Sequence, residues 1–278
     1  MFSESESPTI QVQQLSVELG GACLLHQVSC QFHAGKIHTI LGQNGAGKST
    51  LLHCLSHEMQ PSQGHIVWQG KPLKTLSYAE LACQRAVLSQ SNELAFSFSV
   101  EALVSLGEEV QQRTPSQSKQ VIETVLAVCD MTNLKHRDYL TLSGGEKKRA
   151  QLARVLAQIW PVEWCEHAKE GGGGFFLGKW LLLDEWTAGL DIKHQQSLAR
   201  YFKQWAAQGL GIIMVLHDIS LAAQLADDCC LLKDGKVFAM GDVTAVLQAS
   251  ILQQALEMNV RVEMDKATQR PLIYPVLF

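Results

Sequence analysis

A glycine-rich stretch near the N-terminus has the residue types and spacing of a phosphate-binding loop. It fits the pattern G-x-x-x-x-G-K-[ST] and lies directly after a predicted strand and before a predicted helix. The residues of this phosphate loop are Gly42, Gln43, Asn44, Gly45, Ala46, Gly47, Lys48, Ser49 and Thr50. Its glycines allow backbone N–H groups to surround phosphate oxygens, Lys48 would reach the β- and γ-phosphates, and the Ser49 hydroxyl would bind Mg²⁺. The pattern by itself predicts a nucleotide binder, a class that includes GTPases and kinases.

Two acids follow an apolar run in the second half of the chain. The run Leu181–Leu183 leads directly into Asp184 and Glu185. At the carboxyl end of a buried strand, Asp184 would hold Mg²⁺ through a water molecule, opposite the phosphate loop. Glu185 would polarise an attacking water as general base. An acidic pair that only caps a helix after a core strand is the alternative interpretation.

A third motif, which we call the signature segment, is Leu142-Ser143-Gly144-Gly145-Glu146. It precedes a helix-compatible run. A serine hydroxyl and two glycines at a helix N-terminus form an anion site, although the same residues would also serve as a simple helix cap. The segment resembles the LSGGQ signature of ABC ATPases. Its order along the chain, after the phosphate loop and before the two acids, is also that of the family.

The resemblance implies a shared active site. Residues Ser143–Gly145 would close over the γ-phosphate of a nucleotide bound by a partner subunit, so that a homodimer has two composite sites. Gln90 would contact Mg²⁺ and move with the surface that contacts the transporter. Asp191 would lie in a loop that crosses the dimer interface, and His217 would hydrogen-bond the γ-phosphate. The implied ligands are ATP and Mg²⁺, and the implied reaction is hydrolysis to ADP and phosphate.

Two positions depart from the family pattern. The family usually has proline after the acidic pair, where this chain has Trp186. Proline fixes φ and stiffens a turn, so Trp186 is expected to change how Glu185 is presented without removing the base. The aromatic residue that usually stacks on adenine is also missing, and Val17 and Leu19 occupy its neighbourhood. We therefore expect adenine to pack on an aliphatic side chain.

The transported cargo is indicated only by resemblance. The stretch Val215–Ala223 is similar to the VLHDLNLAA segment of importer ATPases for iron–siderophores, haem and cobalamin. Within that group, the run Leu142–Trp160 and the excursion Pro161–Lys179 resemble the hemin-import ATPases (HmuV type). The excursion contains consecutive glycines, which predict a flexible surface insertion. Haem is the implied cargo, an iron–siderophore or cobalamin is the alternative, and the ATPase would not contact the cargo directly.

Composition restricts the partners. The chain has 278 residues and a net charge of −4, and nothing in it indicates a surface for nucleic acid. Its apolar runs are far shorter than the ~20 residues of a membrane-spanning helix, and its N-terminus does not have the pattern of a signal peptide. We expect a peripheral subunit on the cytoplasmic face of the bacterial inner membrane. Its partners would be transmembrane permease subunits and, indirectly, a periplasmic substrate-binding protein.

The elements that must position these residues follow from hydrophobic periodicity. Alternation in Ile10–Leu19 and Leu24–Phe32 predicts an antiparallel pair, and strands that alternate with helices follow, among them a helix at Ile192–Ala207. Residues Cys229–Met240 are predicted to form a hairpin that turns at Asp234-Gly235. The pattern predicts an α/β fold, a P-loop NTPase ABC ATPase domain with an antiparallel β subdomain and an inserted helical subdomain. We expect a nucleotide-binding domain over residues 8–250, with the helical subdomain at about 91–150 and the flexible insertion at 161–179. Residues 251–278 would form a C-terminal extension packed on the domain.

Other classes of function fit the motifs less well. A soluble ABC ATPase that acts on DNA or ribosomes would generally carry coiled coils, a second cassette or basic arms, which this sequence does not have. A P-loop kinase or GTPase would not account for the signature segment or for His217. A catalytically weak regulatory subunit stays open because of Trp186.

Overall fold

The computed structural model describes residues 9–89, 96–167 and 174–276. The chain divides into two compact units. The first unit takes the chain up to Leu76 and again from Gly211 onwards, and the second unit comprises Ser77–Leu210. The first unit is therefore built from two separate stretches of sequence, with the second unit inserted between them.

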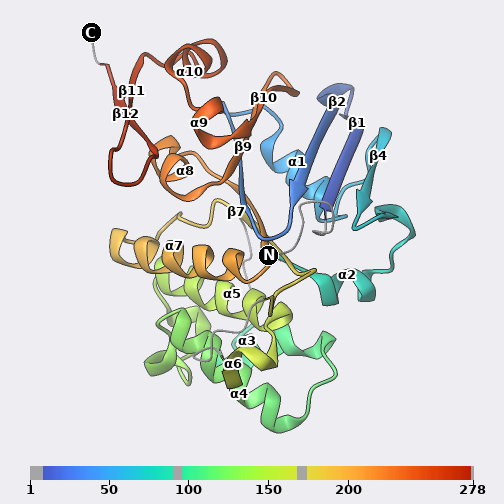
Figure 1. The fold of residues 1–278 in the computed structure, drawn as a ribbon. Helices are drawn as coiled ribbons and strands as arrows, with labels where there is room; N and C mark the ends of the chain where they lie inside the picture. The colour runs from blue at the N-terminus through green and yellow to red at the C-terminus, as the bar shows by residue number, and fades with distance from the viewer. Residues whose placement is uncertain (1–8, 90–95, 168–173, 277–278) are drawn as a thin grey trace. The chain divides into compact units, whose positions relative to one another are not determined.

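Antiparallel strands form one part of the first unit (Figure 1). Strand β1 (Thr9–Leu19) pairs with β2 (Ala22–His33), and β4 (Gln63–Trp68) pairs with the other edge of β1. The short β5 (Lys71–Pro72) completes the order β2-β1-β4-β5. Buried and exposed residues alternate along much of β1 and β2, as expected for strands that cover a core with one face. The predicted antiparallel pair is confirmed.

Parallel strands form the other part of the first unit. Strand β3 (Ile37–Gly42) lies between β8 (Gly211–Val215) and β9 (Asp228–Lys233) and is parallel to both. All five residues of β8 are buried, which agrees with its continuous apolar sequence. Strand β10 (Lys236–Asp242) returns antiparallel to β9, so the hairpin predicted at Asp234-Gly235 is confirmed.

Short helices and a terminal hairpin complete the first unit. Their bounds are α1 (Lys48–Leu55), the 3₁₀ turn η1 (Leu73–Thr75), α8 (Ile219–Leu225), α9 (Val243–Val246), α10 (Ala249–Leu256), β11 (Val260–Met264) and β12 (Pro271–Pro275). Arg270 anchors the β11–β12 hairpin, because its guanidinium donates to the carbonyls of Ala223 and Ala226 at 3.3 and 2.6 Å and to Asp227 at 3.4 Å. The same Asp227 accepts a hydrogen bond from the backbone N–H of Ile37 at 2.8 Å. The hairpin is thereby fastened to the start of β3.

The second unit is mostly helical (Figure 1). Its helices are α2 (Tyr78–Gln84), α3 (Val100–Ser105), α4 (Pro115–Val128), α5 (Gly144–Ile159), α6 (Val162–His167) and α7 (Ile192–Ala207), with 3₁₀ turns η2 (Leu106–Val110), η3 (Thr132–Leu134) and η4 (Tyr139–Thr141). Helix α5 contacts α2, α3 and α4. Strands β6 (Arg85–Leu88) and β7 (Trp180–Asp184) pair in parallel. The helix predicted at 192–207 has those bounds, and the segment at about 91–150 lies within this unit.

Aromatic side chains fill the core of the second unit around α7. Trp205 makes an edge contact with Trp160 at 5.2 Å between ring centroids, and Trp160 does the same with Phe176 at 5.6 Å. Phe176 belongs to the excursion Pro161–Lys179 and is fully buried. The interpretation of this excursion as a surface insertion is therefore wrong at Phe176, because an aromatic side chain there completes a core. Its consecutive glycines lie outside the described residues, apart from Gly174.

No helix in the described ranges has the length and apolar character required to cross a membrane.

Candidate nucleotide-binding and hydrolysis site

The phosphate loop connects β3 to α1. Gly42 ends the strand and Gly47 is the N-cap of the helix, with φ values of +154° and +96°. A Cβ atom on Gly42 would lie 2.5 Å from the carbonyl oxygen of Leu232. One on Gly47 would lie 2.6 Å from the Leu25 side chain. The backbone can therefore follow this path only with glycine at these two positions, which leaves its N–H groups accessible to phosphate oxygens.

Lys48 lies inside the loop that it follows. Its side chain is largely buried, and its ammonium donates to the carbonyl oxygens of Gly42 and Gln43 at 3.0 Å each. These contacts hold the positive charge against the backbone of the loop. Ser49 and Thr50 occupy the first turn of α1, where hydroxyl groups follow the lysine directly. The sequence prediction of a strand–loop–helix context is confirmed.

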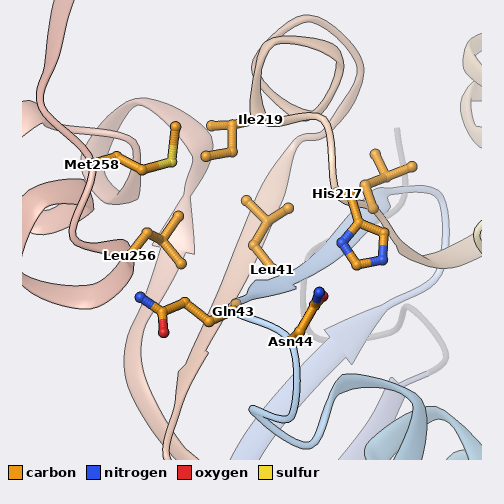
Figure 2. A pocket seen from close by; sticks show the side chains of 9 residues that line it. Leu41, Gln43, Asn44, His217, Ile219, Leu256 and Met258 are labelled. Atoms are coloured by element: carbon orange, nitrogen blue, oxygen red, sulfur yellow. The ribbon is translucent and has the colours of Figure 1, made fainter. Parts of the chain in front are cut away.

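His217 borders a pocket of about 230 Å³ beside the phosphate loop, within the first unit. Figure 2 shows the imidazole of His217 and the amide of Asn44 at one end of this pocket, and Gln43 near Leu256 and Met258 at the other. Sequence reasoning identified His217 but missed Leu256 and Met258. They follow from no motif, because the chain brings them to the loop only through the packing of α10.

The predicted acids lie at the end of β7. Asp184 is the last residue of the strand and is 1% exposed, and Glu185 follows it with a partly exposed side chain. The backbone of Glu185 has φ +47°, a left-handed conformation that costs a non-glycine residue on the order of 1 kcal/mol. The N–H of Ala188 then donates to the Glu185 carbonyl at 3.1 Å. We call residues 184–191 the carboxylate turn.

Trp186 fixes the carboxylate turn through the core. It is 1% exposed, and its ring makes an edge contact with Phe202 at 5.0 Å. Phe202 in turn contacts Trp205 at 5.7 Å, so the turn joins the aromatic cluster of Trp160, Phe176 and α7. The large apolar contact supplied by a buried tryptophan can offset the strained backbone at Glu185. At the position where the family resemblance implies a stiffening proline, this chain anchors the turn with a side chain.

The signature segment opens α5. Ser143 is the N-cap, its hydroxyl accepts from the N–H of Glu146 at 3.4 Å, and its own N–H donates to the Glu146 carboxylate at 2.7 Å. The hydrogen bond from the backbone N–H of Ser143 is the main cause of the lowered pKa of the Glu146 carboxyl, and the Ser143 side chain lowers this pKa further. A Cβ on Gly144 would meet nothing within 4 Å, whereas one on Gly145 would lie 2.6 Å from the carbonyl oxygen of Gly189. Gly145 is therefore required by the close approach of the carboxylate turn, and Gly144 leaves an open surface.

Other predicted residues of the second unit lie around the same segments. Asp191 ends the carboxylate turn and is the N-cap of α7, and the hydrogen bond from the N–H of His194 is the main cause of its lowered pKa. On α5, burial lowers the pKa of Lys148, while the carboxylates of Asp184 and Glu185 oppose this shift. Lys148 is a positive charge near the acids that sequence reasoning missed. Gln90 lies outside the described residues.

The chain is similar to known proteins over most of its length. Residues 25–162 match the ABC transporter family. The hemin import ATP-binding protein HmuV of Escherichia coli O157:H7 is 40% identical over 265 residues, which cover 95% of this chain and 98% of that protein. The HmuV protein of Gloeobacter violaceus is 39% identical over 264 residues, covering 94% of this chain and 92% of that one.

The chain belongs to the ABC transporter ATP-binding protein family. Solved structures agree with the fold expected of this family. The ATP-binding subunit of an ABC transporter superposes with a TM-score of 0.74 at 20% identity, covering 89% of this chain and 96% of that one. CbiO1 from Clostridium perfringens, part of the CbiONQ transporter complex, gives 0.69 at 26% identity, covering 90% and 94%. The α/β fold and the family resemblance predicted from the sequence are both confirmed.

Proposed function

We propose that this chain is the ATP-hydrolysing subunit of an ABC importer for haem. The observation that carries the proposal is identity of about 40% over nearly the whole length with proteins named for hemin import. Three motifs support the ATPase part directly: the phosphate loop with its required glycines and Lys48, the acids at the end of β7, and the signature segment at the N-terminus of α5. The cargo rests on the relatives, because these motifs bind nucleotide and none of them recognises haem.

The residues fit a nucleotide and a hard divalent cation. Two glycines that exclude a Cβ surround the buried ammonium of Lys48, which suits a polyphosphate. The Ser49 hydroxyl and the Asp184 carboxylate are the oxygen donors that Mg²⁺ prefers, and Gln90 would add a third. Bound Mg²⁺ would neutralise charge on the β- and γ-phosphates.

In the proposed mechanism the chain works as a homodimer. Lys48 and the loop N–H groups bind the phosphates of ATP, and Ser143–Gly145 of a second copy contact the γ-phosphate. Glu185 accepts a proton from the attacking water, and His217 hydrogen-bonds the γ-phosphate. Dimer closure on ATP and reopening after hydrolysis would drive permease subunits, since a ligand that binds one state better shifts the equilibrium towards that state.

The membrane location follows from the partner. We propose that the chain is held on the cytoplasmic face of the bacterial inner membrane by transmembrane permease subunits, and that a periplasmic binding protein delivers the cargo on the other side. The proposed mechanism does not involve nucleic acid.

Growth of a strain that lacks the gene tests the cargo. Hemin is supplied as the only source of iron, with ferric salt and siderophore iron as controls. We expect selective failure on hemin, restored by the wild-type chain and not by Lys48→Ala or Glu185→Gln. Normal growth on hemin, in a strain without a second haem system, would contradict haem import and move the cargo to an iron–siderophore or cobalamin.

A further inference from the structure

His194 belongs to none of the motifs, yet it contacts the end of the carboxylate turn and α5, which we call the signature helix because the signature segment opens it. It lies in the first turn of α7, three residues after Asp191. Its backbone N–H donates to the Asp191 carboxylate at 2.9 Å, and its ring atom Nδ1 lies 2.8 and 2.9 Å from the two oxygens of that carboxylate. Asp191 is therefore held by both the main chain and the side chain of one residue.

The other ring nitrogen of His194 faces the signature helix. Nε2 lies 3.0 Å from a guanidinium nitrogen of Arg149 on α5, and 3.2 Å from a carboxylate oxygen of Asp130. Arginine only donates hydrogen bonds and a carboxylate only accepts them, so Nε2 cannot bond to Arg149 and to Asp130 in the same tautomer. With the ring proton on Nδ1, the atom Nε2 accepts from Arg149 and Nδ1–H donates to Asp191, while Asp130 receives no hydrogen bond from the ring. In this tautomer His194 links Asp191 to Arg149 through one rigid ring.

The side chain of His194 is more buried than those of the acids around it. Its side chain is 16% exposed, whereas those of Asp191 and Asp130 are 65% and 70% exposed. The imidazole therefore occupies the less accessible centre of the cluster. An acid that would otherwise be free to rotate in water is restrained by a group that is itself packed.

A second contact joins the same two segments a few residues away. The signature residue Gly145 approaches the carbonyl of Gly189 so closely that a Cβ would lie 2.6 Å from it. The carboxylate turn thus approaches the start of α5 directly at Gly189, and at Asp191 it is linked to α5 through His194 and Arg149. Two separated contacts fix both the position and the orientation of one segment against the other.

We propose that His194 is a positioning residue that holds Asp191 against the signature helix through Arg149. The signature segment and the end of the carboxylate turn would then meet a second copy of the chain, and its bound nucleotide, as one preformed surface. This inference rests on the proposed function, because it assumes that turnover needs two copies. His194 itself would not touch the nucleotide.

Two substitutions in the full-length chain separate the contact of His194 with Asp191 from its contact with Arg149. In His194→Asn the amide nitrogen takes the place of Nδ1, so the contact with Asp191 remains and the reach to Arg149 is lost. In His194→Gln the longer side chain can still reach Arg149, but it has no atom at the position of Nδ1, so the side-chain contact with Asp191 is lost. We expect kcat for ATP hydrolysis to fall about tenfold in both. Affinity for a fluorescent ATP analogue at low protein concentration should not change, because the phosphate loop lies in the other unit.

A double-mutant cycle tests the route through Arg149. If His194 acts through Arg149, then His194→Asn combined with Arg149→Gln costs no more turnover than Arg149→Gln alone, whereas independent effects would multiply. The matched control is His136→Asn, at a histidine of the same unit whose side chain is 75% exposed. Thermal unfolding of every variant checks that the fold is retained.

The outcomes are distinct. Wild-type turnover in both His194 variants, with an active wild-type chain, overturns the proposal, as does a loss confined to His194→Gln, which would leave only the bond to Asp191. Multiplicative losses in the cycle overturn the route through Arg149. A wild-type chain without ATPase activity would instead contradict the proposed function itself. Equal falls in both variants with unchanged analogue binding support the proposal.

Discussion

The phosphate loop and the carboxylate turn both connect a buried strand to a helix, but they are held in different ways. The phosphate loop is fixed by Lys48, which bonds to the carbonyls of its own loop, and by Gly42 and Gly47, where a Cβ would clash with Leu232 and Leu25. The carboxylate turn is fixed by distant parts of the second unit, through Trp186 in the aromatic cluster and through the approach of Gly145 to Gly189. A binding loop can be specified by a short motif, whereas the presentation of a general base depends on the packing of a whole unit.

The largest effect is expected from removing the general base Glu185 while the phosphate loop stays unchanged. Glu185→Gln keeps the size and backbone of the residue but cannot accept a proton, so hydrolysis should fall by about 10²–10⁴-fold. Binding of ATP should remain, because the phosphate loop is not changed. Steady-state phosphate release and binding of radiolabelled ATP measure the two properties. Unchanged turnover would exclude Glu185 as the base.

Trp186 tests whether the carboxylate turn depends on the core. Trp186→Ala should lower the free energy of unfolding by about 3–5 kcal/mol, because it leaves a cavity beside Phe202. Trp186→Phe, the matched control, keeps an aromatic contact and should cost less. Denaturant unfolding of both variants measures the difference. Equal stability of Trp186→Ala and the wild type would show that the turn does not need this anchor.

A pair of glycines tests the local character of the phosphate loop. Gly45 and Gly47 both have positive φ, but a Cβ on Gly45 meets nothing within 4 Å, whereas one on Gly47 meets Leu25. Gly45→Ala should cost about 1–2 kcal/mol of stability through backbone strain alone. Gly47→Ala should cost about 1–3 kcal/mol more, through overpacking, and should weaken nucleotide binding. Calorimetric unfolding compares the two, and equal losses would refute the steric argument.

The smallest expected effect concerns the signature segment. Gly145→Ala should lower the free energy of unfolding by about 1–3 kcal/mol, because its Cβ would press on the carbonyl of Gly189. Gly144→Ala should leave stability within about 0.5 kcal/mol of the wild type, since the position is open. Thermal melts measure both. A destabilised Gly144→Ala variant with an unaffected Gly145→Ala variant would reverse the proposed assignment.

Local patterns predicted the elements and the motifs but not the way in which the carboxylate turn is supported. The helix at 192–207 and the hairpin at Asp234-Gly235 follow from periodicity and turn chemistry, which act between near neighbours in the sequence. The burial of Phe176 does not, because a glycine-rich neighbourhood outweighed the signal of one aromatic residue. The part played by His194 could not be predicted either, since Arg149 and Asp191 come together only in the folded unit.

The position of β3 between β8 and β9 has a consequence for synthesis on the ribosome. The strand that leads into the phosphate loop is made early, but both of its neighbours in the sheet come from the stretch after Gly211. Domains generally fold as their residues emerge from the ribosome. The second unit can therefore form its core before β8 and β9, which flank β3 in the sheet, have been translated. The phosphate loop is translated early, but the sheet that holds its strand is complete only after β8 and β9 have been translated. A nascent chain of this protein therefore gains its helical half before it gains a nucleotide-binding loop.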